Sequence, residues 1–287
     1  MQVKFIAEVS SNHNQNIERS LEFIDKAAEI GCSAVKFQLF KIEELFAPEI
    51  LEKSKEHRER KKWELPVEFL PILSERCKES SIMFSCTPFY LKAVEELYPY
   101  VDFYKIASYE LLWDDLLKEC AYTKKPMVLS TGMATIEEVA KAVEVIKKAG
   151  CTDLTLLHCV SGYPTPLEEC NLQAIQTLRE NFQCEVGWSD HSILPAVIYR
   201  AISAWQARMI EFHLDLDRQG AEYAAGHCWL PEEIQAVIQT VRDFYSADGD
   251  GVKLPVPSEL ADREWRADPT DGLRPLLSMR RKWKGEK

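Results

Sequence analysis

The chain has 287 residues and a formal net charge of −11, because 46 Asp and Glu residues outnumber 35 Lys and Arg residues. A hydrophobic share of 46% with 28% charged residues is ordinary for a globular protein and excludes a disordered, collagen-like or coiled-coil chain. The acidic balance argues against nucleic-acid binding, which needs a surplus of basic side chains. The sequence contains no apolar run of about 18 residues, so it does not predict a membrane span.

The cysteines and the N-terminus indicate where the protein works. Nine cysteines are scattered along the chain without a CxxC pair, a pattern typical of reduced, buried thiols rather than of disulfides or a zinc site. The N-terminal residues lack the long apolar run and the cleavage site of a signal peptide. The sequence therefore predicts a cytoplasmic protein without a membrane partner.

Short apolar runs, rich in β-branched and aromatic residues, alternate along the chain with amphipathic helical patterns. Each run is too short for a typical helix, as expected for strands that are buried on both faces. The predicted strands are residues 3–10, 34–40, 82–89, 102–108, 126–131, 154–161, 184–191 and 209–216.

A helical pattern follows each predicted strand. The first helix is expected to end at Gly31, and a later one begins at the capping box of Thr135 and Glu138 and ends at Gly150. Eight β/α units with a mean repeat of about 29 residues predict a parallel sheet closed into a (β/α)₈ TIM barrel of the α/β class. An open doubly wound sheet would usually carry a Gly-rich phosphate loop, and neither GxGxxG nor GxxxxGK[ST] occurs.

Two segments interrupt this rhythm. Residues 41–65 form a long, charge-dense insertion after the second strand, which suits a lid or rim of the active site. Residues 247–287 contain too few apolar residues for a second core. We therefore expect a catalytic barrel domain over 1–246 and a C-terminal tail over 247–287, without a second domain.

Polar residues end every predicted strand, although buried strands should otherwise be apolar. The active site of a (β/α)₈ barrel lies at the carboxyl ends of its strands, where a buried charge must be paired or useful. In strand order these residues are Glu8 and Ser10; Lys36 and Gln38; Ser85 and Thr87; Lys105, Ser108 and Glu110; Ser130 and Thr131; His158, Ser161 and Tyr163; Ser189, Asp190 and His191; Glu211, His213 and Asp215.

Lys36 and Lys105 lie inside otherwise apolar runs, where an unpaired ammonium group costs several kcal/mol. One interpretation is that each lysine pairs with a carboxylate such as Glu8 or Glu211. The other is an anion cradle, in which both lysines and nearby hydroxyl groups bind the oxygens of a small polyanion. The hydroxyl groups of this cradle would be those of Thr87, Ser108, Ser130 and Ser189.

His191 and His213 end adjacent strands, so their imidazoles can converge on one divalent ion. Two imidazoles with water and a substrate oxygen suit a catalytic site for Mn²⁺, Zn²⁺ or Fe²⁺. The alternative is a hydrogen-bonded polar cluster with Asp190 or Glu211.

Eight motifs carry a family resemblance: IAEVSSNHN, AVKFQ, CTPF, FYKIAS, VLSTGMAT, LLHCVSGYPTP, VGWSDH and IEFHLDLD. In this order, over about residues 5–245, they closely resemble the sialic acid synthase family, the N-acetylneuraminate synthases and related nonulosonate synthases. The resemblance implies a (β/α)₈ barrel that condenses phosphoenolpyruvate with an N-acylated hexose such as N-acetylmannosamine. The product is a nine-carbon 2-keto sugar acid, phosphate is released, and Mn²⁺ or Mg²⁺ assists.

The resemblance also implies residue roles. His191 and His213 match the metal ligands, Glu8 and Glu110 match carboxylates that are candidates for proton handling, and Tyr163 matches a tyrosine that lines the sugar pocket. Ser161 stands where an asparagine is common. The phosphoenolpyruvate contacts fall on Lys36, Thr87, Lys105, Ser108, Ser130 and Ser189.

The chain departs from the family pattern in two places. After the last strand the family usually reads GPDH, with its Asp on the sugar, whereas this chain reads AEYAAGHC. His227 matches the family histidine, Gly226 replaces the Asp, and whether Glu222 compensates stays open. The family's C-terminal antifreeze-like domain is expected to be absent from this chain. The phosphoenolpyruvate half of the site therefore looks intact and the acceptor half altered.

Two alternatives to this reading stay open. One is a 2-keto sugar acid synthase that uses a different aldose or aldose phosphate. The other is a non-catalytic sugar- or phosphate-binding paralogue, against which the retained lysines and histidines argue. The expected partners are phosphoenolpyruvate and an aldose acceptor, a homo-oligomer stays open, and neither nucleic acid nor membrane is expected.

Overall fold

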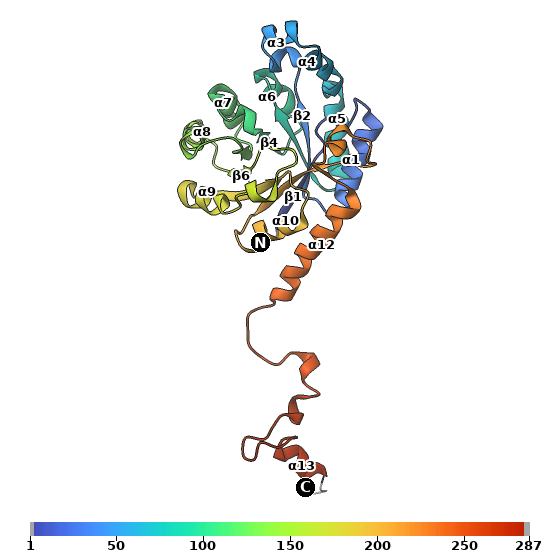
Figure 1. The fold of residues 1–287 in the computed structure, drawn as a ribbon, viewed down its shortest axis with the longest axis vertical. Coiled ribbons are helices and arrows are strands. Elements are labelled where there is room, and N and C mark those ends of the chain that lie inside the picture. Colours follow the sequence, from blue (N-terminus) through green and yellow to red (C-terminus); the bar gives the residue numbers. More distant parts are fainter. Residues whose placement is uncertain (1–2, 284–287) are drawn as a thin grey trace. The chain divides into compact units, whose positions relative to one another are not determined.

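The structure is a computed structural model that describes residues 3–283, and in it eight parallel strands close into a barrel (Figure 1). Each strand pairs with the next along the chain, and the first pairs with the eighth to close the ring. The predicted (β/α)₈ barrel is confirmed. The strands are β1 (Lys4–Glu8), β2 (Ala34–Leu39), β3 (Met83–Pro88), β4 (Phe103–Ile106), β5 (Met127–Ser130), β6 (Leu154–Cys159), β7 (Glu185–Asp190), β8 (Met209–Leu214) and β9 (Cys228–Trp229).

Helices follow the strands and surround the barrel (Figure 1). The predicted capping box of Thr135 and Glu138 is present, and Gly31 and Gly150 follow their helices with φ of 90° and 94°, a conformation that favours glycine. The main helices are α1 (Ile17–Glu29), α5 (Leu70–Glu79), α6 (Leu91–Leu97), α7 (Asp114–Tyr122), α8 (Ile136–Lys148), α9 (Ala174–Phe182), α10 (Pro195–Ser203) and α12 (Pro231–Asp248).

The charged insertion folds into short helical pieces. Gln15, in the loop after β1, donates from Nε2 to the carbonyl oxygens of Lys61 (3.1 Å) and Glu64 (3.0 Å). The end of the insertion therefore lies beside the loop at the carboxyl end of β1. The pieces of this region are α2 (Ile42–Leu45), α3 (Pro48–Lys53), α4 (Lys55–Glu59), η1 (Arg60–Trp63) and η2 (Val67–Phe69).

An apolar layer fills the interior of the barrel toward the amino ends of the strands. Side chains two residues apart on a strand share a face, so the next inward position lies closer to the carboxyl end. The apolar layer therefore sets the level at which the polar mouth begins. Its members are Ile6, Ala34, Phe103, Val128, Leu157 and Met209, with Met83 packed against them.

A short segment after β8, which we call the excursion, was not predicted from the sequence pattern. A single-turn helix, α11 (Ala221–Ala224), leads back to β9, which pairs with β8 so that His213 lies opposite Cys228. This excursion brings residues 222–228 to the carboxyl end of β8. It forms part of the barrel mouth.

A second unit begins at residue 244. It contains η5 (Pro257–Glu259), η6 (Arg263–Trp265) and α13 (Leu277–Trp283), and the Arg280 guanidinium makes two contacts of 2.6 and 2.8 Å with Asp271. The unit begins three residues before the predicted boundary. None of the helices within residues 3–283 combines the length and the apolar composition that a bilayer crossing requires.

Candidate active site

The inward face of the barrel changes from apolar to charged within two residues. In β1, β2, β4 and β8, the position two residues beyond the apolar layer carries a charged side chain, and none of these four residues is more than 4% exposed. They converge because parallel strands in register present the same level to the barrel axis. They are Glu8, Lys36, Lys105 and Glu211, which we call the lysine cluster.

Ion pairs connect the lysine cluster. The Lys36 ammonium group contacts Glu8 closely and lies 3.9 Å from Glu211, and Lys105 Nζ lies 3.1 Å from Glu211 Oε1. Burial disfavours the charged forms, but Glu8 and Glu211 raise the pKa of Lys36, and Lys105 and Lys36 lower the pKa of Glu211 to about 2. The lysine–glutamate pairing that the sequence left open is therefore formed.

This pairing constrains how an anion can bind. Each lysine already contacts a carboxylate oxygen, the same type of group that a phosphate or carboxylate ligand presents. Two ammonium groups facing two carboxylates form a charge-balanced cluster. A polyanion can therefore enter only by sharing the ammonium groups with Glu8 and Glu211, or by displacing or protonating a carboxylate.

Two of the predicted hydroxyl groups lie within the lysine cluster. Thr87 Oγ1 accepts a hydrogen bond of 3.3 Å from Lys36, and Ser189 Oγ donates one of 3.0 Å to Glu211. Both residues are buried. They can turn their hydroxyl groups to a bound oxyanion without moving the strands.

The other predicted hydroxyl groups lie on β5 and around Gly132, which follows it. Ser108 Oγ accepts a hydrogen bond of 3.0 Å from the Gly132 N–H, and Ser161 Oγ is buried without a hydrogen-bond partner among residues 3–283. A Cβ on Gly132 would lie 2.5 Å from Ser161 Oγ and 2.9 Å from Ser108 Oγ. Ser130 is the buried last residue of β5. The glycine therefore allows two hydroxyl groups and an N–H to come close together.

Glu110 lies just beyond the lysine cluster, in the single turn η3 (Ser108–Glu110) that follows β4. Burial raises the pKa of Glu110 to about 8, and nearby Lys105 opposes the shift only in part. Its Oε2 atom has no hydrogen-bond partner among the described residues 3–283. At neutral pH the group is therefore a protonated carboxylic acid.

Imidazoles line the other side of the mouth. The ring centroids of His191 and His213 lie 5.4 Å apart, those of His213 and His227 lie 5.0 Å apart, and the Tyr163 ring lies 4.2 Å from His191. His191 Nδ1 is 2.7 Å from the Val160 carbonyl oxygen. Burial, reinforced by His213, lowers the pKa of His191 to about 3, so its ring is the neutral form that binds metals.

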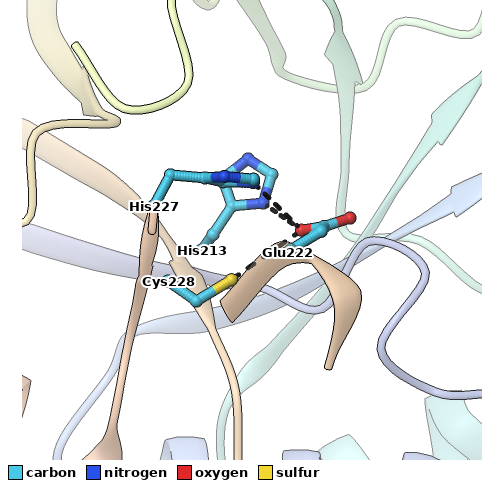
Figure 2. A group of neighbouring side chains, drawn as sticks. All are labelled: His213, Glu222, His227 and Cys228. Carbon is cyan, nitrogen blue, oxygen red and sulfur yellow. Dashed lines mark hydrogen bonds and ion pairs between the residues drawn. The ribbon is translucent and has the colours of Figure 1, made fainter. Parts of the chain in front are cut away.

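Glu222 joins two of these imidazoles, those of His213 and His227 (Figure 2). Its Oε2 atom lies 2.7 Å from His213 Nδ1, 3.6 Å from His227 Nε2 and 3.9 Å from Cys228 Sγ, and the three contacts converge on this oxygen. Burial would lower the pKa of His213, but the Glu222 carboxylate outweighs it and raises that pKa. We call His191, His213, Glu222 and His227 the histidine cluster.

Three members of the histidine cluster, together with Cys228, fit a divalent metal ion. One potential ligand atom from each of His213, Glu222, His227 and Cys228 lies within 4.8 Å of the others, and His227 Nδ1 is buried without a partner among residues 3–283. Imidazole nitrogens with a carboxylate oxygen are common ligands of divalent ions. The expected pair of His191 and His213 lies side by side, although His191 is outside the group of four.

The contacts of Glu222 were not predicted from the sequence, which left its role open. The alternative partners expected for the histidines were Asp190 and Glu211, but Asp190 instead accepts hydrogen bonds from the indole nitrogens of Trp188 (3.0 Å) and Trp229 (2.9 Å). The only signal was the departure of the AEYAAGHC stretch from the family pattern. The contribution of Cys228 was missed altogether.

A chain of hydrogen bonds links the lysine cluster to the histidine cluster. Gln38 Nε2 donates to Glu8 Oε1 (2.5 Å) and lies 3.3 Å from Ser10 Oγ, which in turn donates to Glu222 Oε1 (2.5 Å). The two clusters are therefore one continuous polar surface at the barrel mouth. A donor and an acceptor bound to the two clusters would lie side by side.

Comparison with known proteins agrees with this geometry. Residues 23–253 match the profile of the NeuB family. The chain belongs to the NeuB family. It is 34% identical to the N,N'-diacetyllegionaminic acid synthase of Legionella pneumophila, with 90% of this chain and 76% of the relative covered. It is 35% identical to a pseudaminic acid synthase of Campylobacter jejuni, with 87% and 76% covered.

A solved structure gives the same result for this NeuB-family chain. The N-acetylneuraminic acid (sialic acid) synthetase of Leptospira borgpetersenii, solved in complex with citrate, superposes with a TM-score of 0.80 at 32% identity. The match covers 93% of this chain and 92% of that one. The family resemblance and the prediction that the protein is a synthase are confirmed.

Proposed function

We propose that this NeuB-family protein condenses phosphoenolpyruvate with an N-acylated hexose, such as N-acetylmannosamine, to a nonulosonic, sialic-acid-like 2-keto acid and releases phosphate. The observation that carries this proposal is the joint placement of two clusters at one barrel mouth. Buried lysines with hydroxyl groups suit a small polyanionic donor, and the adjoining imidazoles suit a metal-bound acceptor. The named relatives make products of this class.

The donor binds at the lysine cluster in this proposal. Lys36 and Lys105 offset the charge of the phosphate and carboxylate groups, and the hydroxyl groups orient the donor's oxygens. Since Glu8 and Glu211 already balance these lysines, donor binding is accompanied by a rearrangement of the ion pairs or by proton uptake. The hydroxyl groups that we assign to the donor are those of Thr87, Ser108, Ser130 and Ser189.

The acceptor binds at the histidine cluster, between Tyr163, Ser161 and His227. His191 and His213 would hold a divalent ion, Mn²⁺ or Mg²⁺, and when bound this ion supplies Lewis-acid polarisation of the acceptor's aldehyde oxygen. His191 is in the neutral form that binds metal ions, because burial lowers its pKa. The placement of both histidines at the mouth then fixes the aldehyde next to the donor.

Carbon–carbon bond formation follows from this placement. C3 of phosphoenolpyruvate adds to the aldehyde carbon, water attacks the cationic C2, and phosphate leaves with cleavage of its C–O bond. Glu110 is protonated at neutral pH and suits the acid that delivers a proton to the new alkoxide. Glu8, ion-paired to Lys36, suits the carboxylate that orients the water and accepts its proton.

A different aldose or aldose phosphate remains the second candidate acceptor. The observation that favours it is the replacement of the family's Asp by Gly226, together with the entry of Glu222 into the acceptor side of the mouth. A carboxylate at this position changes which hydroxyl or amide groups of a sugar are accepted.

Phosphate release from phosphoenolpyruvate tests the proposal directly. With Mn²⁺ present, we expect release to depend on an added acceptor and to be fastest with N-acetylmannosamine or a related N-acylated hexose. Release with other aldoses only would support the second acceptor class. No turnover with any acceptor, despite phosphoenolpyruvate binding, would leave a binding protein and contradict the proposal.

We also propose that residues 1–246 are the catalytic domain, that residues 247–287 are a tail, and that the protein works in the cytoplasm. All nine cysteines are free thiols, and only Cys184 is not buried, which supports a reducing compartment. The barrel carries every residue to which we assign a role. Removing residues 249–287 should therefore leave donor binding intact.

A further inference from the structure

Both carboxylate oxygens of Glu222 contact other side chains of the barrel mouth. Oε2 makes the 2.7 Å contact with His213 Nδ1, while Oε1 accepts hydrogen bonds from Ser10 Oγ (2.5 Å) and Ser11 Oγ (3.2 Å). Its side chain is 17% exposed. The carboxylate is thus fixed on both oxygens by residues from β8 and from the loop after β1.

The contact with Glu222 determines which nitrogen His213 can offer to an ion. A carboxylate oxygen accepts a hydrogen bond, so at 2.7 Å the proton lies on Nδ1 and the lone pair of the neutral ring lies on Nε2. His191 has the same arrangement, with Nδ1 at 2.7 Å from the Val160 carbonyl oxygen. In the neutral form of both rings, Nε2 is therefore the nitrogen whose lone pair is available to an ion.

The spacing of the two rings is compatible with one ion between them. The observed distance between the His191 and His213 centroids is 5.4 Å. Two imidazoles this close together can supply their nitrogens to one divalent ion.

We propose that Glu222 is a positioning residue that holds His213 in the tautomer and orientation that present Nε2 to a divalent ion shared with His191. This inference rests on the proposed function, from which it takes the ion. A carboxylate behind a metal-bound histidine fixes the ring and strengthens its donor nitrogen, and its loss typically weakens metal affinity about 10–100-fold. Glu222 reaches this position because α11 turns it back toward β8.

Titration of the full-length protein with Mn²⁺, followed by electron paramagnetic resonance, tests the inference without catalysis. We expect Glu222→Ala to bind Mn²⁺ about 10–100-fold more weakly than the wild type. Glu222→Gln keeps an acceptor oxygen without the charge, and it should lose less affinity. The matched control is Glu232→Gln, since Glu232 is an exposed glutamate paired to Arg218, and its Mn²⁺ affinity should be unchanged.

A metal-free readout separates positioning from a general loss of structure. In the wild type at alkaline pH, the ¹⁵N shifts of the His213 ring should report a proton on Nδ1, and in Glu222→Ala this preference should disappear. Phosphoenolpyruvate affinity should stay the same in both proteins. If donor and Mn²⁺ affinities fall together in a variant that remains folded, Glu222 supports the whole site rather than His213, and the positioning role is overturned.

The remaining outcomes distinguish this inference from the proposed function. Equal Mn²⁺ affinity of the wild type and Glu222→Ala overturns the inference and leaves the proposed function standing. A wild type that binds no divalent ion overturns the proposed metal role and the inference with it. A structure of the Mn²⁺-loaded protein in which a Glu222 oxygen is itself a ligand also overturns the positioning role.

Discussion

The lysine cluster and the histidine cluster share one barrel mouth but are built on different parts of the chain. All four members of the lysine cluster lie on strands, two residues beyond the apolar layer. In the histidine cluster only His213 lies on a strand, while Glu222 comes from a single-turn helix and His227 from the loop before β9. Strand positions are fixed by barrel geometry, whereas loops vary without cost to the core.

This difference matches the division of labour that we propose. In that proposal the donor is bound by the rigid part of the barrel, and the acceptor by the part that can change between relatives. The named relatives fit this division, because their names differ in the sugar acid that they make. Variants that separate donor from acceptor effects are therefore the sharpest way to test the comparison.

The largest effect should come from Lys105→Met. The substitution leaves Glu211 buried without its closest cation, and breaking a buried ion pair costs about 3–5 kcal/mol of unfolding free energy. We also expect kcat/KM for phosphoenolpyruvate to fall more than about 1000-fold, because a charge-assisted contact to the donor is lost. Chemical denaturation and phosphate release measure the two effects.

A paired variant separates stability from donor binding. The double variant Lys105→Met, Glu211→Gln removes both charges. Its free energy of unfolding should therefore be close to that of the wild type, while its kcat/KM for phosphoenolpyruvate stays low. Recovery of both would show that Lys105 serves only to neutralise Glu211, and the donor side of the comparison would be wrong.

His213→Ala should have the next largest effect, and it acts on the other cluster. Loss of a metal ligand should reduce metal-dependent turnover about 100–1000-fold, while phosphoenolpyruvate affinity and the unfolding free energy change little. His57→Ala is the matched control, because His57 lies in the insertion, where its side chain bonds to Ser54. Full activity of His213→Ala without added metal would contradict the Lewis-acid role.

The contrast between the clusters also explains what could be predicted from sequence. The short apolar runs placed Lys36 and Lys105 within buried strands, and capping signals placed helix ends such as the Thr135 box. These are local properties, and each is fixed by a few neighbouring residues. Such local patterns could not decide whether the ion pairs form, because pairing depends on the side-chain geometry of four separate strands.

Glu222 shows why the rest could not be predicted. It is separated from His213 by eight residues, and its position depends on the backbone path of that whole loop. The two-residue strand β9, which fixes the far end of the loop, is too short to give a pattern of its own. A mismatch with a known motif can flag such a loop but cannot say where its side chains lie.

Glu110→Gln should produce a smaller effect, and one that depends on pH. With a pKa of about 8, Glu110 is a neutral acid below that value and ionised above it, so activity should fall as pH rises through about 8. Glutamine cannot donate the proton, and kcat should fall about 100-fold with loss of this alkaline limb. An alkaline limb unchanged in the variant would assign it to another group.

The stability of the protein should carry the same signature. The pKa of Glu110 is raised from an ordinary value of 4.5 to about 8, so the folded protein binds this proton more tightly than the unfolded chain does. The free energy of unfolding should therefore decrease as pH rises between these two values. In Glu110→Gln this decrease should be smaller, which thermal unfolding at several pH values can measure.

The smallest effect is expected for Gly132→Ala, which probes the hydroxyl groups rather than the charges. The new Cβ would approach Ser161 Oγ to 2.5 Å and Ser108 Oγ to 2.9 Å, and both side chains can rotate away at little cost in stability. Displacing Ser108, which we assign to the donor, should raise the KM for phosphoenolpyruvate about 3–10-fold, since a lost hydrogen bond contributes about 1 kcal/mol. Displacing Ser161, which we assign to the acceptor, should raise the acceptor KM to a similar extent. The kcat should change little.

Gly162→Ala is the control for that experiment, because the nearest atom to its added Cβ, the Pro164 carbonyl oxygen, lies at an ordinary contact distance of 3.8 Å. Steady-state kinetics with each substrate varied in turn gives the decisive readout. A raised donor KM in Gly132→Ala supports the assignment of Ser108 to the donor side, with the lysines. An unchanged donor KM beside a raised acceptor KM would assign Ser108 to the acceptor side, and the boundary between the two substrates would then lie elsewhere.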